Sequence, residues 1–224
     1  FLVTKSDARD PEGMTRLLSR SLERMQTDHI DLYFIHGISQ ISELNDDTRA
    51  WAERARKDGR IKLFGFSTHK NMQDCMLAAA GLEWIDGIMM KYDFRLMHDK
   101  RMREAVAACA KAGIGLTAMK TQGGGPVRTE SEADLALAGQ FVKRGFTEKQ
   151  AKLKAVWEEP AIACICSQMP NVTILKANVE AALDELPLTG AERAGLRDYA
   201  SATAGGYCAG CGHICETASG LPVC

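Results

Sequence analysis

The sequence lacks features that would mark out several classes of protein. Its 224 residues carry a formal net charge of only −1, with 28 lysines and arginines against 29 aspartates and glutamates. This balance gives no basic field that would attract nucleic acid or anionic lipid. No apolar run approaches the length of a membrane span. The composition therefore argues against a nucleic-acid partner and against a membrane protein.

Cysteine is scarce over most of the chain, because four of the eight cysteines fall after Gly205. The other four lie among apolar or small residues and are expected to be small core residues: Cys75, Cys109, Cys164 and Cys166. No linker or shift in composition appears before Gly205. We therefore expect one domain over residues 1–204 and a short Cys-rich tail over residues 205–224.

Short β-rich runs alternate with helical stretches along this domain. The apolar runs predict strands over 1–5, 30–36, 61–67, 85–91, 114–119 and 161–167. The helical spacing and caps predict helices over 10–26, 46–59, 71–81, 99–113, a stretch ending near Trp157, 174–186 and 190–200. Asp10 and Asn71 are the expected caps of two of these helices, with Pro11 at the first helical position.

This alternation predicts a parallel sheet with functional side chains at the carboxyl ends of its strands. Six strand–helix units fit an open doubly wound sheet. They also fit a (β/α)₈ barrel that lacks its first two units. Periodicity alone does not choose between these two α/β folds.

Four motifs resemble the aldo/keto reductase family: "LVTK", "SLERMQTDHIDLYFIHG", "GRIKLFGFSTH" and "YDF". The resemblance runs from Phe1 to about Leu186. It implies a (β/α)₈ TIM barrel in which "LVTK" is the third strand, so that two βα units would precede Phe1. Because the chain also opens without Met, we expect upstream sequence, with any targeting segment on it. The tail resembles the ferredoxin-like cysteine run that ends some bacterial members.

The resemblance implies hydride transfer between a nicotinamide, NADP or NAD, and the carbonyl carbon of a small molecule. The carbonyl oxygen gains negative charge, so it needs a proton donor and positive or hydrogen-bonding groups. Lys5 and His36 match the family's Lys and His. The matching Asp and Tyr would lie on the preceding segment. Tyr33 does not replace that Tyr, because it lies an odd number of residues before His36 on the same strand and faces the other side of the sheet. Tyr92 is not assigned that role either.

For the cofactor, the resemblance implies contacts with the nicotinamide carboxamide, the phosphates and the adenine side. The matching positions are Ser67, Thr68, Lys120, Thr121, Gly123, Gly124, Gln168 and Asn178. A polar strand end is the competing interpretation of Thr68. Met89 stands where the family usually has a Gln that bonds the carboxamide. The last strand, "CICSQMPN", lacks the Lys or Arg that relatives use to hold a 2′-phosphate. A preference for NADP over NAD is therefore not expected.

The tail cysteines allow three interpretations: Cys208, Cys211, Cys215 and Cys224. Disulfides are the least expected, because a cytoplasmic reductase works in a reducing compartment. Zinc is possible, since His213 lies close to two of these thiols. A 4Fe-4S cluster is favoured because four thiolates suit it, although the spacing departs from C-x₂-C-x₂-C-x₃-C-P.

Three functions follow from these observations. The first is an NAD(P)H-dependent oxidoreductase of aldehydes or ketones with an accessory iron–sulfur cluster. The second is a non-catalytic regulatory module that binds a dinucleotide. The third is an electron-transfer protein in which the tail cluster serves a redox partner protein.

Overall fold

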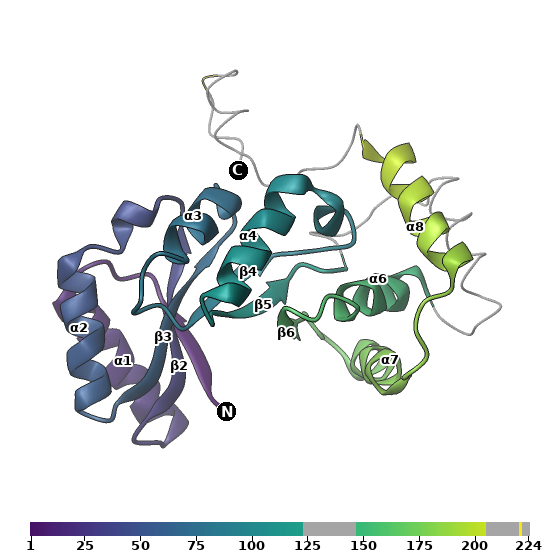
Figure 1. The fold of residues 1–224 in the computed structure, drawn as a ribbon. Coiled ribbons are helices and arrows are strands. Elements are labelled where there is room, and N and C mark those ends of the chain that lie inside the picture. The colour runs from purple at the N-terminus through teal and green to yellow at the C-terminus, as the bar shows by residue number, and fades with distance from the viewer. Residues whose placement is uncertain (123–146, 205–219, 221–224) are drawn as a thin grey trace. The chain divides into compact units, whose positions relative to one another are not determined.

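The computed structural model describes residues 1–122, 147–204 and 220 (Figure 1). Six strands form one sheet in chain order, and β1–β2, β2–β3 and β3–β4 pair in parallel. Their bounds are β1 Val3–Ser6, β2 Ile30–Ile38, β3 Ile61–Thr68, β4 Gly87–Lys91, β5 Gly115–Met119 and β6 Ile162–Cys166. The α/β fold predicted from the sequence is therefore confirmed.

The helices lie between these strands and after β6. They are α1 Pro11–Met25, α2 Asp46–Lys57, α3 Met72–Ala79, α4 Lys100–Lys111, α6 Glu148–Trp157, α7 Val172–Leu183 and α8 Gly190–Ala202. Two short 3₁₀ turns, η1 Ile41–Glu43 and η2 Leu96–His98, follow β2 and β4. Each predicted strand and helix has its counterpart, displaced by at most a few residues at the ends. Among the described residues, every helix is too short or too polar to span a bilayer.

Two predicted helix caps have different outcomes. The Asp10 carboxylate accepts a 2.7 Å hydrogen bond from the amide of Gly13, with Pro11 beginning α1 as expected. Asn71 is the N-cap residue of α3 as predicted, but its side chain makes no capping hydrogen bond. Its backbone is left-handed, with φ of 49°, and its Nδ2 donates instead to the carbonyl of Ser39 at 3.1 Å. The amide is thus used to hold the loop after β2.

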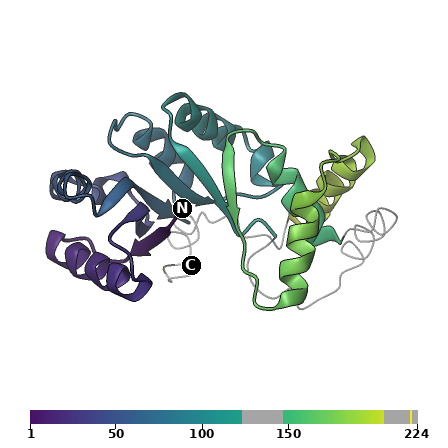
Figure 2. The same cartoon turned by 90° about the horizontal axis from the view of Figure 1, so that it is seen from below.

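The described residues form two compact units. Unit 1 comprises Phe1–Met90 and Glu104–Thr117, and unit 2 comprises Lys91–Arg103 with residues 118–122 and 147–204. In unit 1, α1 and α2 lie side by side along one face of the sheet (Figures 1 and 2). The Tyr33 ring packs on that face, 5.3 Å from the Trp51 ring of α2 and 6.5 Å from the Phe64 ring. The Tyr33 side chain therefore faces α2.

Strands β3 and β4 approach closely at a pair of glycines. A Cβ at Gly65 would lie 1.9 Å from the carbonyl oxygen of Gly87, a distance that atoms cannot adopt. Gly65 belongs to the motif "GRIKLFGFSTH", so this part of the motif has a packing role. The close approach fixes the spacing of the strands that carry Ser67 and Met89.

Unit 2 has its own small core. Its buried apolar side chains are Phe94, Ala151, Ala155, Leu188 and Leu196. The Arg95 guanidinium lies 5.1 Å from the centre of the Phe94 ring and 5.2 Å from that of Tyr199. The same side chain donates to the carbonyl of Ala200 at 2.7 Å and to the Thr203 hydroxyl. One side chain thus fastens the last turns of α8.

The four cysteines outside the tail divide into two pairs. Cys75 and Cys109 are buried as predicted, and burial raises the pKa of each thiol to about 11. The prediction for Cys164 and Cys166 was wrong, because both are exposed on β6. β6 ends the strand order, so only one of its edges has a strand neighbour within the described sheet. Apolar sequence alone did not reveal this edge position.

Candidate active site

The carboxyl ends of four strands place four predicted side chains on one face of the sheet in unit 1. Lys5 of β1 is in register with Phe34 of β2, and Phe34 with Gly65 of β3. Ser67 of β3 is in turn in register with Met89 of β4. Alternate residues of a strand share a face, and the register shift of β2 against β3 falls between Ile35 and Ile38, where Gly37 is left-handed. With the irregularity assigned to Gly37, after His36, the set on this face comprises Lys5, His36, Ser67 and Met89. This is the face opposite Tyr33 and the helices α1 and α2.

The Lys5 ammonium lies near a soft and weak acceptor. Its Nζ, on β1, is 3.9 Å from the Sδ of Met89 on β4. Within the described ranges, no carboxylate forms an ion pair with Lys5. A thioether accepts hydrogen bonds only weakly, so the ammonium retains its capacity to stabilise a negative charge nearby. Met89 is almost fully buried, with 7% of its surface exposed.

The His36 imidazole has a carboxylate partner that the sequence analysis did not predict. Its Nδ1 lies 2.6 Å from Oδ1 of Asp7, in the loop that follows β1. The imidazole is 38% exposed and the Asp7 side chain 86% exposed. The signal that could have found Asp7 is its register: Ser6 pairs with Ile35, so the next step along both strands sets Asp7 beside His36.

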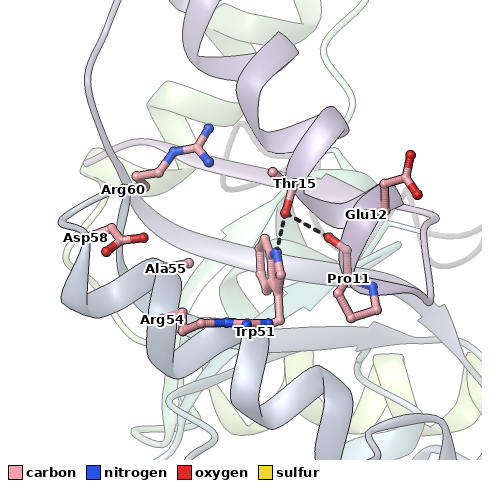
Figure 3. A pocket seen from close by; sticks show the side chains of 8 residues that line it. All are labelled: Pro11, Glu12, Thr15, Trp51, Arg54, Ala55, Asp58 and Arg60. Carbon is pink, nitrogen blue, oxygen red and sulfur yellow. Dashed lines mark hydrogen bonds between the residues drawn. The ribbon is translucent and has the colours of Figure 1, made fainter.

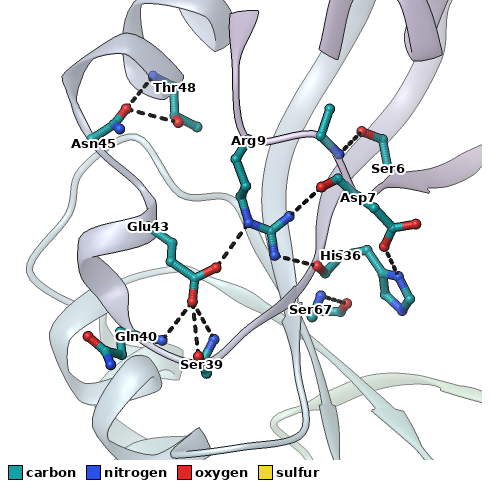
Figure 4. Close-up of polar contacts among 12 residues, drawn as sticks. Ser6, Asp7, Arg9, His36, Ser39, Gln40, Glu43, Asn45, Thr48 and Ser67 are labelled. Carbon is teal, nitrogen blue, oxygen red and sulfur yellow. Dashed lines mark hydrogen bonds and ion pairs between the residues drawn. The ribbon is translucent and has the colours of Figure 1, made fainter. Parts of the chain in front are cut away.

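Arg9 joins the loop after β1 to the loop after β2 (Figure 4). Its guanidinium donates to the carbonyls of Asp7 at 3.1 Å and of His36 at 2.8 Å, and to Oε2 of Glu43 at 3.0 Å. The other Glu43 oxygen accepts from the amides of Ser39 and Gln40, at 2.7 and 3.1 Å. Partial burial opposes the charge of Glu43, but the bonds from Ser39 and Arg9 outweigh it and lower the pKa of this carboxyl.

Ser67 and Thr68 at the end of β3 are both fully buried but differ in their contacts. The Ser67 hydroxyl accepts a hydrogen bond from the amide of Gly37 at 3.0 Å, which leaves its own O–H to donate. The Thr68 hydroxyl donates to the carbonyl of Lys70 at 2.8 Å. The Thr68 hydroxyl proton is therefore engaged in a local hydrogen bond. This agrees with the interpretation of Thr68 as a polar strand end.

In unit 2, three uncharged polar side chains converge from two strand ends and from α7. Gln122 donates to Oδ1 of Asn178 at 3.0 Å and accepts from the Ser167 hydroxyl at 2.8 Å. Asn178 donates to the same hydroxyl at 3.2 Å. Asn178 was predicted from the sequence. Gln122 and Ser167 were missed, and their only signal was that each follows closely on a strand.

The remaining predicted cofactor residues are more dispersed. The Thr121 hydroxyl is buried and donates to the carbonyl of Tyr92 at 3.1 Å. Lys120 has an exposed side chain and a left-handed backbone with φ of 57°, an unusual conformation for a residue other than glycine. Gln168 is exposed. Gly123 and Gly124 lie outside the described residues.

The tail cysteines also lie outside the described residues: Cys208, Cys211, Cys215 and Cys224. In the part of the chain that the structure describes, no three His, Cys, Asp or Glu side chains are grouped so as to hold a metal ion. The expectation of a metal in the tail therefore rests on the cysteine spacing.

Tyr92 is a poor proton donor where it lies. Its side chain is fully buried, and its hydroxyl has no hydrogen-bond partner among the described residues. Burial raises the pKa of this phenol far above its ordinary value. Tyr33 is buried against α2, and burial raises its pKa as well. The Tyr33 phenol lies on the opposite face of the sheet from Lys5 and His36.

A pocket of about 350 Å³ in unit 1 lies away from this set (Figure 3). It is lined by residues of α1 and α2 and of the turn after α2: Pro11, Glu12, Thr15, Trp51, Arg54, Ala55, Asp58 and Arg60. The Trp51 indole donates to the Thr15 hydroxyl at 2.9 Å, and that hydroxyl donates to the carbonyl of Pro11 at 2.7 Å. The pocket contains none of the predicted site residues.

The chain thus has a parallel α/β sheet with basic and hydroxyl side chains at the carboxyl ends of its strands. Residues 1–166 match the model of the aldo/keto reductase family, and the chain belongs to this family. A comparison of the sequence with curated proteins finds no match.

Solved structures of aldo/keto reductases share the fold at low sequence identity. The holo form of aldo-keto reductase AKR11C1 from Bacillus halodurans is 21% identical, with a TM-score of 0.68, over 89% of this chain and 71% of that chain. The thermostable aldo-keto reductase Tm1743, solved with the inhibitor epalrestat, is 22% identical, with a TM-score of 0.69 over the same shares. An aldo/keto reductase from Klebsiella pneumoniae, solved with NADP and acetate, is 21% identical, with a TM-score of 0.66 over 90% of this chain and 69% of that chain.

Proposed function

We propose that this protein is an NAD(P)H-dependent oxidoreductase that reduces the carbonyl group of a small aldehyde or ketone by hydride transfer. The observation that carries the proposal is that Lys5 and His36 stand at the carboxyl ends of adjacent parallel strands and on one face of the sheet. Family membership supports it, as does the NADP bound to the Klebsiella pneumoniae reductase.

The side chains present fit a nicotinamide dinucleotide. A carboxamide both donates and accepts hydrogen bonds, and the buried Ser67 hydroxyl retains a proton to donate. Within unit 2, Gln122, Ser167 and Asn178 bring together amide and hydroxyl groups of a kind that can hydrogen-bond a nucleotide. When bound, the reduced nicotinamide supplies the hydride.

Lys5 and His36 act on the carbonyl oxygen in this proposal. As the carbon receives hydride, negative charge develops on the oxygen, and a nearby ammonium and imidazole stabilise it. We do not assign the proton that completes the alcohol to Tyr33, which is buried on the helix side of the sheet, or to Tyr92, whose buried phenol is a poor donor. We place the donor outside the described residues, and the resemblance to the family implies a Tyr with a partner Asp. Reading the gene upstream of Phe1 tests this assignment.

We propose a metal role for the tail as well. Four thiols within 17 residues, from Cys208 to Cys224, suit a 4Fe-4S cluster, with zinc as the alternative. Anaerobic purification followed by iron, sulfide and zinc analysis distinguishes the two. Iron and sulfide in equal amounts, with broad visible absorbance that Cys211→Ser removes, support the cluster, and a colourless zinc protein contradicts it.

The experiment for the main proposal follows NADPH and NADH oxidation with a panel of aldehydes and ketones. The protein is expressed with any coding sequence that precedes Phe1 in its gene. Lys5→Met and His36→Gln are expected to lower kcat/KM about 100-fold or more. Lys57→Met and His29→Gln are the controls, at the exposed end of α2 and in the turn before β2. Both controls are expected to leave the rate within about twofold, because surface substitutions remote from the reacting groups have small effects.

Two results decide against this function. Dinucleotide binding without turnover, for every carbonyl tested, indicates the non-catalytic regulatory module, which Met89 in place of the family's Gln favours. Electron exchange between the tail and the dinucleotide, without carbonyl reduction, indicates an electron-transfer protein.

A further inference from the structure

We propose that Asp7 is a positioning residue for His36, which fixes the proton on Nδ1 of the imidazole, and that Arg9 and Glu43 hold this pair in place. The inference rests on the proposed function, because that proposal assigns His36 its role at the carbonyl oxygen. Asp7 does not itself contact the reacting atoms.

The Asp7 carboxylate and the His36 imidazole are in direct contact. The atoms Oδ1 and Nδ1 are 2.6 Å apart, within hydrogen-bond distance. An ionised carboxylate can only accept a hydrogen bond, so Nδ1 must carry the proton. In the neutral ring, Nε2 then holds the lone pair. In the charged ring, Nε2 also carries a proton and can donate to a carbonyl oxygen. Asp7 thus decides which nitrogen carries the proton in the neutral ring.

The Asp7 carboxylate lies beside the imidazole because of where β1 ends. Its position comes from the parallel register of β1 and β2, because Lys5 pairs with Phe34 and Ser6 with Ile35. The turn after β1 is closed by the Ser6 hydroxyl, which accepts from the amide of Ala8 at 3.2 Å. The turn keeps Asp7 at the end of β1, beside the imidazole at the end of β2.

The Arg9 guanidinium connects the backbone at Asp7 to the backbone at His36. Arg9 donates to the carbonyl of Asp7 and to the carbonyl of His36, so one planar group spans both residues of the pair (Figure 4). Glu43 accepts a hydrogen bond from Nε of the same guanidinium. The other oxygen of Glu43 accepts a hydrogen bond from the amide of Ser39. Arg9 and Glu43 are 35% and 29% exposed, so solvent screens their pair less than a fully exposed one.

The remaining charged and polar groups near His36 do not compete for Nδ1. Lys5 lies on the adjacent strand, with its ammonium at Met89. On β3, the Ser67 hydroxyl bonds the amide of Gly37, the residue that follows His36. Arg9 reaches the backbone carbonyl of His36, and Glu43 reaches Arg9. Asp7 is therefore the group that bonds the ring in the described part of the chain.

The chain contains a matched control for this pair. In the turn before β2, Nδ1 of His29 lies 2.7 Å from Oδ1 of Asp28, with exposures of 34% and 95%. The chemistry and the exposure resemble those of Asp7 and His36, but the pair lies at the opposite end of β2. Asp28→Asn thus removes a comparable hydrogen bond to Nδ1 at a place without a proposed catalytic role, where Nε2 lies 3.8 Å from Oδ1 of Asp31.

The test uses nitrogen-15 labelling of the five histidines in the intact chain, with spectra recorded at about pH 8.5 so that the rings are neutral. His36→Gln and His29→Gln assign the signals. We expect His36 to carry its proton on Nδ1, and Asp7→Asn to shift it toward Nε2 while His29 is unchanged. Asp28→Asn is expected to shift the proton of His29 toward Nε2 and to leave His36 unchanged. Arg9→Lys and Glu43→Gln are expected to weaken the Nδ1 preference of His36 in part.

The kinetic arm separates this proposal from the proposed function. Asp7→Asn is expected to lower kcat about tenfold and to change KM less than about twofold, with Asp7→Glu restoring part of the rate and Asp28→Asn without effect. An unprotonated Nδ1 in the wild type, or a His36 tautomer and a kcat that Asp7→Asn leaves unchanged, overturns the role of Asp7. Absence of turnover in the wild type overturns the proposed function, and the spectra still decide the role of Asp7.

Discussion

Single side chains at strand ends carry the proposed chemistry, and their neighbours determine how they can act. Lys5 and His36 are ordinary residues until the register of β1 and β2 sets them on one face. Asp7 and Arg9 come from the four residues that separate β1 from α1. A short loop between a strand and a helix can thus serve both folding and the site.

Gly65 tests the packing beneath these strand ends. Gly65→Ala would push a Cβ against the carbonyl of Gly87, where backbone rather than a flexible side chain must move. We expect it to lower the free energy of unfolding by about 3 kcal/mol or more, measured by urea titration. Gly81→Ala is the control: the nearest atom to its Cβ would be a carbonyl oxygen at 3.5 Å, an ordinary contact. Equal stability of the two variants would contradict the close approach of β3 and β4.

At the scale of elements, the strands and helices were predictable and the contacts among their loops were not. Hydrophobic runs and caps located β1 to β6 and the helices within a few residues, because periodicity and cap chemistry are local. The Arg9–Glu43 bond joins residues 34 positions apart, and the Gln122–Asn178 bond joins residues 56 apart. No local pattern encodes such pairs. The same limit explains the error at Cys164 and Cys166, whose exposure depends on the place of β6 in the sheet.

Asp31 ties the first three strands together and gives a pH-dependent prediction. The Lys62 ammonium donates to it at 2.7 Å and the Leu2 amide at 2.7 Å, and these bonds lower its pKa from 3.8 to about 2. A lowered pKa means that the stabilisation is present above about pH 4 and is lost as the pH falls toward 2. Asp31→Asn is therefore expected to be less stable than the wild type at pH 7.

This difference is expected to vanish as the pH approaches 2, because the wild-type carboxyl is then protonated as well. Urea unfolding at a series of pH values measures it, with the exposed Asp58→Asn as the control. A stability difference that is the same at all pH values would show that Asp31 acts through packing and not through its charge.

At the scale of the whole molecule, the preference between NADPH and NADH depends on whether a cation is available for a 2′-phosphate. Gln122, Ser167 and Asn178 bond one another within unit 2. The three unit 2 side chains are uncharged, and the stretch "CICSQMPN" supplies no cation for a 2′-phosphate. We therefore expect Kd values for NADPH and NADH within about tenfold of each other, measured by fluorescence titration. A preference for NADPH of about 100-fold or more would show that a cation outside these residues holds the phosphate.

The most direct test of the central claim is the fate of the hydride. The protein, expressed with any coding sequence before Phe1, is supplied with NADPH or NADH deuterated at the transferred position and with a carbonyl compound that it reduces. We expect deuterium on the former carbonyl carbon of the alcohol, detected by mass spectrometry, at a rate that Lys5→Met and His36→Gln each lower about 100-fold or more. Transfer that continues at the wild-type rate in both variants would contradict the assignment of this strand-end face as the reducing site.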